Sequence, residues 1–452
     1  MSITEKIKDI TVVINEGSGV LVQPMTKDYS YVLTAKHVIQ IDKDDPNKGL
    51  LDLSNIHIYK STDEKLIPKK LCPHPVLDIA IIVIDYDSSS IDVIDTSIIQ
   101  NMKLSLYGYP NKSEQHRNPE IPRREWLETY TLDIAEHSDE EIKCYTNEDV
   151  EYDDIEGFSG GGIFYITEKN WFLIGIEHKL HQSGEYANKI ISIPIKCFNT
   201  VISNFGILPI RPPYYSDFKE LKTNIFNYTN CFDINDIKKA TDLIVLNSAS
   251  LLEETTITPF EIITNFEGVF TNLTPNSTPN STPSENRDFW IAFLEFLHIE
   301  GLISPEISWD SNFLKYIIRN YKFVYTTCTK GWKTNLSKLL STNVDNLKNG
   351  GVLFFIENSG DYPNKPDTLT QYRDRIPSNV ANAIEVEDIA NVTSIIDKSI
   401  SIIHLPKLHH SCIYDLEDTL SELNKITDKD KIKELILKGY LNYIKNKGTE
   451  IE

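Results

Sequence analysis

The sequence predicts a protein of several domains, with an all-β domain at the N-terminus and an α or α+β domain at the C-terminus. Between residues 10 and 205, short runs rich in Ile, Val, Tyr and Thr alternate with Gly, Pro, Asn and Asp, a pattern typical of many short strands. After about residue 208, apolar residues recur at helical intervals instead. With 452 residues, the chain is long enough for each part to bury a core of its own.

Composition narrows the class of function. The net charge of −21 argues against a general nucleic-acid binder and against binding to anionic membranes. The first residues lack the apolar core of a signal peptide, and no run of about 18 apolar residues exists, so we expect a cytoplasmic protein. The six cysteines stand far apart without a CxxC pair, which predicts buried thiols and not disulfides or a zinc site. We expect no cofactor and no metal.

Two polar residues stand at the ends of predicted strands. His37 follows the run 31–34, which forms a predicted hairpin with 19–23. Asp78 stands at the start of the nearly all-apolar run 77–84, where a carboxylate is costly unless it has a partner. Taken singly, a lone histidine is most often structural, and an aspartate at a strand entry most often belongs to a turn. Further strands are expected at 104–108, 171–176 and 190–194.

A glycine-rich stretch surrounds Ser159. Gly157 precedes the serine by two positions, and glycines fill the three positions after it. Glycines allow turns that other residues resist and let N–H groups converge beside a hydroxyl. Acyl transfer needs such a nucleophile next to donors aimed at a developing oxyanion. The alternative is a glycine-rich turn between two strands, but the presence of His37 and Asp78 in the same all-β segment favours chemistry.

Together these segments resemble the trypsin-like serine peptidases, specifically the intracellular bacterial kind related to the HtrA and glutamyl-endopeptidase groups. The resemblance covers roughly residues 8–205 and implies a double β-barrel with the active site in the cleft between the barrels. The matching segments are 17–21, 34–38, 78–80, 108–110 and 157–161.

The resemblance implies a role for each residue. Ser159 would be the nucleophile, and His37 the general base and then the general acid. Asp78 would hold the imidazole in the right tautomer. The backbone N–H groups of Gly157 and Ser159 would form the oxyanion hole.

The sequence departs from the family at two positions. Phe158 stands where secreted trypsins carry an aspartate that pairs with a freed N-terminus, so we expect no zymogen cleavage of that kind. Gly162 stands where the family often has proline, and we expect little effect from this change.

Substrate specificity is predicted from an acidic run before the nucleophile. A run of this kind is often a solvated loop. The resemblance, however, puts Asp153 where trypsin-type enzymes keep their pocket aspartate, which predicts cleavage after Lys or Arg. His178 follows the strand that would form the other wall and is predicted to line the pocket. The run contains Glu148, Asp149, Glu151, Asp153, Asp154 and Glu156.

Composition divides the whole chain into four predicted regions. We expect a peptidase domain over 1–207, a mainly helical connecting region over 208–270, a flexible linker over 271–287 and a partner-binding or sensor domain over 288–452. The linker contains a four-residue repeat of Pro, Asn, Ser and Thr, which favours an extended tether.

The predicted C-terminal domain contains no recognisable chemical motif. A helix is expected at 289–297, strands at 352–356 and 400–404, and one or two helices over 416–447. Gly331–Thr334 lacks the upstream glycine and spacing of a phosphate-binding loop. A metal site formed by His404, His409, His410 and Cys412 is the less favoured alternative to structural roles.

The whole arrangement is similar to bacterial ABC-three-component defence proteins, in which a trypsin-like effector is fused to a partner-binding C-terminal domain. It implies a regulated serine endopeptidase in anti-phage defence, with a protein or peptide substrate and a protein partner or activator. Two alternatives remain open: a non-catalytic peptide-binding scaffold and a cytoplasmic quality-control protease.

Overall fold

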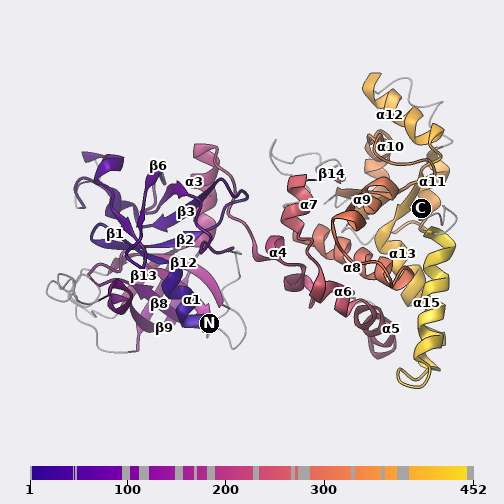
Figure 1. Ribbon diagram of the computed structural model, residues 1–452, viewed down its shortest axis with the longest axis horizontal. Helices are drawn as coiled ribbons and strands as arrows, with labels where there is room; N and C mark the ends of the chain where they lie inside the picture. Colours follow the sequence, from indigo (N-terminus) through magenta and orange to yellow (C-terminus); the bar gives the residue numbers. More distant parts are fainter. Residues whose placement is uncertain are drawn as a thin grey trace. The chain divides into compact units, whose positions relative to one another are not determined.

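The computed structural model forms two compact units, Met1–Pro213 and Tyr214–Glu452, and each is described by itself (Figure 1). The residues that the structure describes are 3–43, 45, 48–93, 102–110, 122–147, 156–166, 171–180, 189–227, 234–265, 270–272, 286–326, 331–357, 362–373 and 386–444.

The first unit contains a seven-stranded antiparallel sheet in the order β5-β4-β1-β2-β3-β7-β6. Its two edge strands follow each other in the chain with only Ile67 between them, so the sheet curls back on itself like a barrel. Helix α1 (Ile3–Ile10) precedes it. The strands are β1 (Thr11–Ile14), β2 (Gly17–Val22), β3 (Tyr29–Thr34), β4 (Ile58–Tyr59), β5 (Lys65–Leu66), β6 (Pro68–Pro73) and β7 (Ala80–Asp85).

The second sheet of this unit is a closed antiparallel barrel in the order β10-β13-β12-β11-β8-β9. Helix α3 (Phe198–Phe205) follows it. The two barrel-like sheets confirm the predicted all-β class of the N-terminal part and fit a trypsin-like fold. The strands are β8 (Lys103–Gly108), β9 (Glu128–His137), β10 (Ile142–Thr146), β11 (Gly162–Ile166), β12 (Trp171–Leu180) and β13 (Lys189–Pro194).

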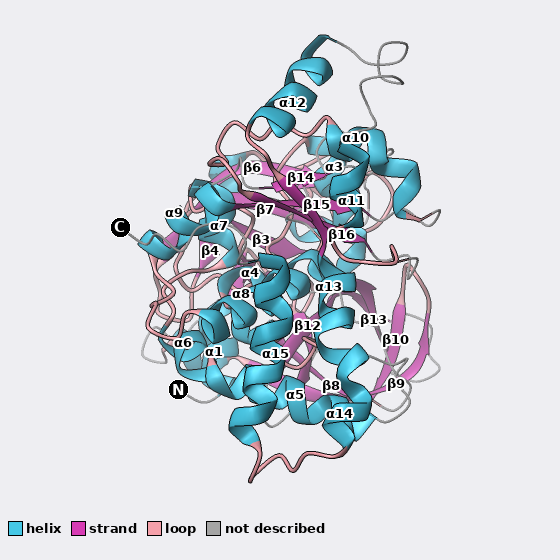
Figure 2. Ribbon diagram, turned by 90° about the vertical axis from the view of Figure 1, so that its right-hand side faces the viewer, coloured by secondary structure: helices cyan, strands magenta, loops and turns pink. Residues whose placement is uncertain are grey.

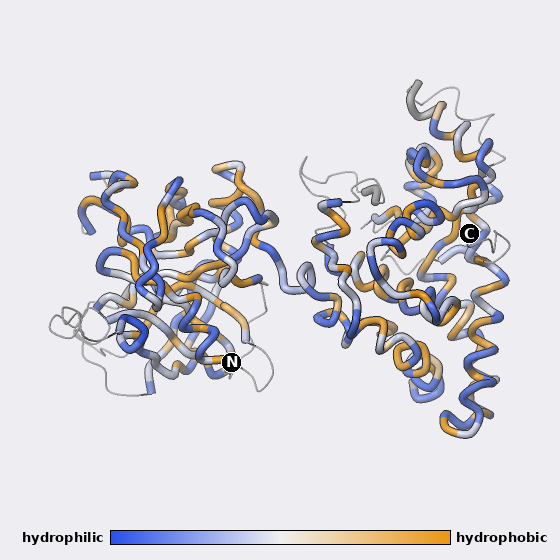
Figure 3. The backbone as a smooth tube through the Cα atoms, in the orientation of Figure 1, coloured by the Kyte–Doolittle hydropathy of each residue, from blue (hydrophilic) through white to orange (hydrophobic). Residues whose placement is uncertain are grey.

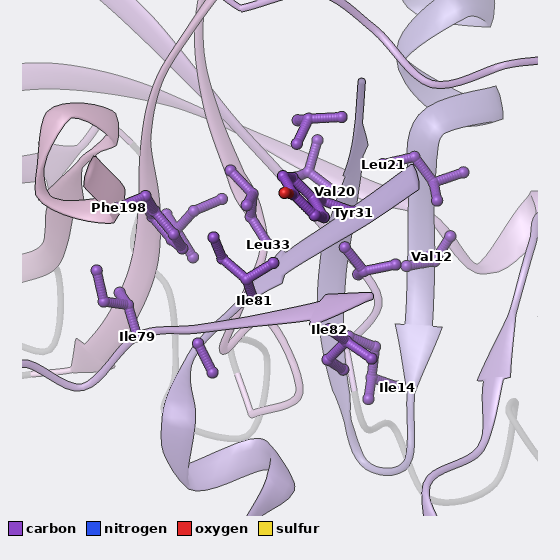
Figure 4. Packing of buried hydrophobic residues seen from close by; sticks show 14 of the residues in the cluster. Val12, Ile14, Val20, Leu21, Tyr31, Leu33, Ile79, Ile81, Ile82 and Phe198 are labelled. Carbon is purple, nitrogen blue, oxygen red and sulfur yellow. The ribbon is translucent and has the colours of Figure 1, made fainter. Parts of the chain in front are cut away.

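One apolar core joins the two sheets of the first unit. Val20, Leu33 and Ile81 from neighbouring strands of the first sheet are fully buried and pack together with Phe198 of α3 (Figure 4). The same cluster includes Phe164 of the closed barrel. Burying an aliphatic or aromatic side chain of this size contributes about 1.5–3 kcal/mol to folding, so this core fixes the two sheets against each other.

The second unit is built on a four-stranded parallel sheet in the order β14-β15-β16-β17, with β14, β15 and β16 side by side in Figure 2. The sequence predicted β16 and β17 but not β15, a fully buried strand of mainly aromatic and β-branched residues that also contains Lys322. The strands are β14 (Phe270–Asn272), β15 (Tyr321–Thr326), β16 (Val352–Glu357) and β17 (Ser401–His404).

Helices cover both faces of this sheet. On one face, the rings of Phe293 and Phe296 of α8 both lie 5.0 Å from the ring of Phe323, and the Phe296 ring lies 5.2 Å from that of Phe354. On the other face, Leu353 packs in a cluster with residues of α10 and α12. Apolar stretches are orange in Figure 3. The helices are α4 (Pro213–Ser216), α5 (Ile234–Asn247), α6 (Ala249–Glu254), α7 (Pro259–Asn265), α8 (Arg287–Ile303), α9 (Ser311–Asn320), α10 (Leu336–Leu340), α11 (Thr368–Arg373), α12 (Val386–Asp397), α13 (Leu405–Ile413), α14 (Glu417–Ser421) and α15 (Lys429–Ile444).

The helices α5, α6 and α7, in the predicted connecting region 208–270, lie in the second unit. The predicted linker 271–287 starts within β14 and ends at the first residue of α8, and its repeat falls outside the described residues. The functions assigned to these segments stay predictions. No helix among the described residues is long and apolar enough to cross a membrane.

Candidate active site

His37 lies on a short 3-10 turn, η1 (Lys36–Ile39), three residues after the end of β3. The neighbours Val38 and Ile39 are buried in the core of the unit and anchor the turn. The amide of Gln40 donates to the His37 carbonyl at 3.2 Å and closes it. The apolar anchor leaves the imidazole, which is 19% exposed, at the surface of the core.

Asp78 lies in the loop that leads from β6 into β7. His74 holds this loop because its ring Nδ1 accepts hydrogen bonds from the amides of Val76 and Leu77, at 3.1 and 2.8 Å. The Asp78 carbonyl in turn accepts from the Lys36 amide at 3.2 Å, which ties the loop to η1. Local backbone contacts therefore bring the aspartate next to the histidine turn.

His37 and Asp78 form a close pair. The ring Nδ1 of His37 lies 2.7 Å from Asp78 Oδ2, and the backbone amide of His37 donates to Oδ1 at 2.9 Å. Burial by itself would raise the pKa of Asp78, but interactions with His178 and His37 outweigh it and hold that pKa well below its usual value. An ionised carboxylate only accepts, so Nδ1 carries the proton and the lone pair is on Nε2.

Ser159 occupies the second position of a tight turn. The amide of Gly161 donates to the Phe158 carbonyl at 2.6 Å, and the third residue, Gly160, has φ +92°. A positive φ at the third position, without one at the second, is typical of a type II turn and favours glycine. A Cβ on Gly160 would also lie 1.9 Å from the Ser18 carbonyl oxygen, so only glycine fits there.

The Ser159 turn is held by both sheets. From β2, the Ser18 amide donates to the Ser159 carbonyl at 2.8 Å, and the Ser18 hydroxyl donates to the Gly157 carbonyl at 2.9 Å. From β12, the backbone carbonyl of Glu177 accepts from the Gly160 amide at 2.8 Å, and the backbone amide of Glu177 donates to the Gly161 carbonyl at 2.9 Å. The nucleophile predicted from the sequence is thus fixed between the seven-stranded sheet and the closed barrel.

Gly17 brings the serine and histidine turns together. A Cβ on Gly17 would lie 2.7 Å from a methyl carbon of Val38, the neighbour of His37, and 2.8 Å from the Ser159 carbonyl oxygen. The two turns therefore both pack against the same point of β2, and a larger residue at Gly17 would push them apart.

The predicted oxyanion-hole donors are available. Within the described part of the chain, no hydrogen bond is formed by the amide N–H of Gly157 or of Ser159. Gly157 has φ +98°, a backbone conformation that residues with a Cβ rarely adopt. The Ser159 amide belongs to the same turn as the serine hydroxyl, and Gly157 directly precedes that turn.

Phe158 anchors this turn in the closed barrel. Its side chain is completely buried, and its ring lies 5.4 Å from the ring of Tyr130. A Cβ on Gly108 would lie 2.6 Å from the Phe158 ring, so the close approach depends on that glycine. The turn is thus supported by apolar packing at the position where secreted trypsins carry an aspartate.

Of the two predicted pocket residues, the structure describes only His178. His178 lies on β12, with its ring Nδ1 3.6 Å from Asp78 Oδ2, a contact that sequence reasoning did not anticipate because the two residues are a hundred positions apart. Asp153 lies outside the described residues, and of the acidic run only Glu156, which is exposed, is described.

The histidines of the second unit have structural partners. His404 caps α13, its ring Nδ1 accepting from the Lys407 amide at 3.2 Å. The ring Nδ1 of His409 lies 2.7 Å from the Tyr440 hydroxyl. Among the described residues, no group of three or more His, Cys, Asp or Glu side chains is arranged to hold a metal ion.

The comparison with protein families concerns mainly the second unit. Residues 192–414 match the family described as C-terminal domain 4 of the ABC-three component (ABC-3C) systems. The match begins in β13 of the first unit and continues through α13 of the second. No curated protein matches the chain. The chain therefore joins an N-terminal unit of two barrel-like sheets to a region similar to a C-terminal domain of these multi-component systems.

Proposed function

We propose that the N-terminal unit is a serine endopeptidase that acts through an acyl-enzyme, with Ser159 as its nucleophile. One observation carries the proposal: His37 Nδ1 lies 2.7 Å from an oxygen of Asp78, whose pKa is held low. An imidazole oriented by an ionised carboxylate, with its second nitrogen free, is what a general base needs. The packing of the serine and histidine turns against Gly17 supports the same conclusion.

The reaction has two halves. His37 Nε2 takes the proton of Ser159 Oγ as Oγ attacks the substrate carbonyl carbon, and the N–H groups of Gly157 and Ser159 stabilise the resulting oxyanion. The imidazolium, stabilised by Asp78, then gives its proton to the leaving amine. In the second half, His37 deprotonates a water molecule that attacks the acyl carbon, and Ser159 regains its proton as the acid leaves.

Labelling with a fluorophosphonate probe tests this proposal on the full chain. We expect covalent labelling of the wild type and of a Ser138→Ala control, in which an exposed serine of the same unit is changed. Ser159→Ala should not be labelled. If Ser159-dependent labelling is absent both with and without candidate partners, the peptidase proposal fails and a non-catalytic peptide-binding scaffold is favoured.

We further propose that the protein is a regulated effector in bacterial anti-phage defence and that its second unit binds a protein partner. The similarity of residues 192–414 to a domain of three-component systems supports this role. The buried Phe158 supports control by a partner, since a phenylalanine cannot pair with a freed N-terminus. Labelling that increases when the protein products of neighbouring genes are added would support the role; equal labelling with and without each of them would contradict it.

We propose that the substrate is cleaved after Lys or Arg, with Asp153 as the charged group of the pocket. A carboxylate in such a pocket selects a basic side chain by charge pairing. Profiling with a peptide library tests this, and Asp153→Ala should lose the preference while Asp154→Ala keeps it. A profile that favours acidic or apolar residues would contradict the proposal.

A further inference from the structure

His178 is a partly buried residue next to the candidate site, and the proposed reaction does not use it. Its side chain is 12% exposed, and ring Nδ1 lies 3.6 Å from Asp78 Oδ2. This distance is longer than a direct hydrogen bond but short enough for the ring to act on the carboxylate electrostatically. Asp78 thus has two histidines beside the same oxygen, since His37 Nδ1 lies 2.7 Å from it.

His178 has no other polar partner in the described part of the chain. Neither of its ring nitrogens forms a hydrogen bond there, although both are buried. A buried polar group without a hydrogen bond costs about 1–3 kcal/mol, so a histidine at this position is unfavourable for packing alone. The carboxylate of Asp78 is the group that stabilises it, and the low pKa of Asp78 reflects the same interaction.

A β-bulge gives His178 its direction. In the pairing of β12 with β13, Glu177 lies opposite Ser192 and Lys179 lies opposite Ile191, which leaves His178 as an extra residue. In a regular ladder, successive side chains alternate between the two faces of the sheet. A bulge breaks this alternation and can re-aim one side chain, and bulges are frequent beside active sites.

The residue before His178 holds the serine turn. The backbone of Glu177 accepts from the Gly160 amide at 2.8 Å and donates to the Gly161 carbonyl at 2.9 Å. Two consecutive residues of β12 therefore contact both parts of the candidate site, one through its backbone and the other through its side chain. Because β12 belongs to the closed barrel and Asp78 leads into β7 of the other sheet, the contact of His178 joins the two sheets.

We propose that His178 is a positioning residue: it holds Asp78 from the closed barrel, so that the carboxylate keeps the orientation that His37 requires. This inference rests on the proposed peptidase function and adds a residue to it. His178 acts on the reaction only through Asp78, and the packing of the two sheets becomes a condition for a correctly oriented base.

A double-mutant cycle on the full chain tests the proposal through the rate of fluorophosphonate labelling. His178→Leu, which removes the ring nitrogens, should slow labelling about 10- to 100-fold, because Asp78 loses the electrostatic interaction that holds it from the closed barrel. His178→Asn keeps an N–H donor near the position of Nδ1 and should restore most of the rate. His57→Leu, which changes an exposed histidine of the same unit, is the control and should label like the wild type.

The second arm of the cycle separates positioning from a general structural role. In an Asp78→Asn background, His178→Leu should slow labelling further by less than about threefold, because residues that act as a unit are not additive. Equal slowing in both backgrounds, or no slowing in the wild-type background, would overturn the proposal.

Proton NMR of the full chain gives a readout that needs no turnover. The proton on His37 Nδ1, bonded to Asp78, should give a resolved low-field resonance in the wild type and in Ser159→Ala. It should move or broaden in His178→Leu and return in His178→Asn. An unchanged resonance in His178→Leu overturns the positioning role. Absent labelling together with a shifted resonance overturns the peptidase proposal alone.

Discussion

Carboxyl groups that are partly or fully buried have opposite pKa shifts in the two units. In the first unit, interactions with two histidines hold the pKa of Asp78 well below its usual value despite burial, so the group is ionised. In the second unit, burial raises the pKa of Glu295 and of Glu300 to about 7. The nearest polar contacts of these glutamates are the Phe226 amide and the Tyr321 hydroxyl, which are neutral donors.

The histidines follow the same division. Burial lowers the pKa of His404 and of His409 to about 3, so both rings are neutral at ordinary pH. Their Nδ1 atoms contact the Lys407 amide and the Tyr440 hydroxyl, and the carboxyl group 3.7 Å from His409 Nε2 is that of Glu295, whose pKa is raised. His37, in contrast, faces an ionised carboxylate. A buried histidine therefore does not by itself indicate a chemical site. The charge of the group that the histidine contacts is the better indicator.

The largest expected effect comes from removing the charge at Asp78. Asp78→Asn should slow fluorophosphonate labelling about 10⁴-fold, because the amide no longer fixes the tautomer of His37. The matched control is Asp85→Asn, which changes an exposed carboxylate at the other end of β7. Labelling of Asp78→Asn within tenfold of the wild type would contradict the assigned role.

Phe158 tests whether apolar packing supports the serine turn. Phe158→Ala should lower the free energy of unfolding by about 3–5 kcal/mol, because it leaves a cavity in the closed barrel. Tyr145→Ala on β10 removes an exposed ring of the same barrel and should cost far less. Urea unfolding followed by circular dichroism measures both, and equal losses would show that Phe158 is not an anchor.

Glu300 tests whether a buried carboxyl group of the second unit is neutral. Its folded pKa of about 7 lies above the ordinary glutamate value of 4.5, so its contribution to stability is present at low pH and is lost as the pH rises through 7. Glu300→Gln carries no charge at any pH. Relative to the wild type, the variant should therefore gain up to about 3 kcal/mol between about pH 5 and pH 8. Urea unfolding at several pH values measures this difference.

The control for this prediction is Glu306→Gln, which changes an exposed glutamate. Its stability should follow the pH profile of the wild type. A Glu300→Gln profile parallel to that of the wild type would mean that Glu300 is ionised in the folded protein, and the contrast with Asp78 would disappear.

The smallest expected effect separates backbone strain from a steric clash. Gly160→Ala and Gly49→Ala both put a side chain on a positive-φ residue, at about 1–3 kcal/mol each. A Cβ on Gly49 meets nothing within 4 Å, whereas one on Gly160 meets the Ser18 carbonyl. We therefore expect a further loss of stability, and slower labelling, only for Gly160→Ala. Equal stability and labelling of the two variants would contradict the tight fit of the turn.

Much of the fold could be predicted from the sequence, because strand patterns and turn residues are local signals. The all-β class of the first unit and the strands β16 and β17 of the second were predicted from short apolar runs. The strand β15 was missed because Lys322 interrupts its apolar run, whereas the apolar run of β16 is unbroken from Val352 to Ile356. The parallel pairing itself depends on contacts between distant segments.

By itself, the sequence determined which residues have the chemistry for a site. Each of these signals lies within a short stretch of sequence: the glycines around Ser159, the strand ends at His37 and Asp78, and the apolar runs. Only the tertiary structure decided which groups meet: the pairing of His37 with Asp78 and the approach of His178 to the same carboxylate. The physical reason is that a carboxylate's charge depends on the groups around it, and these come from strands far apart in the chain.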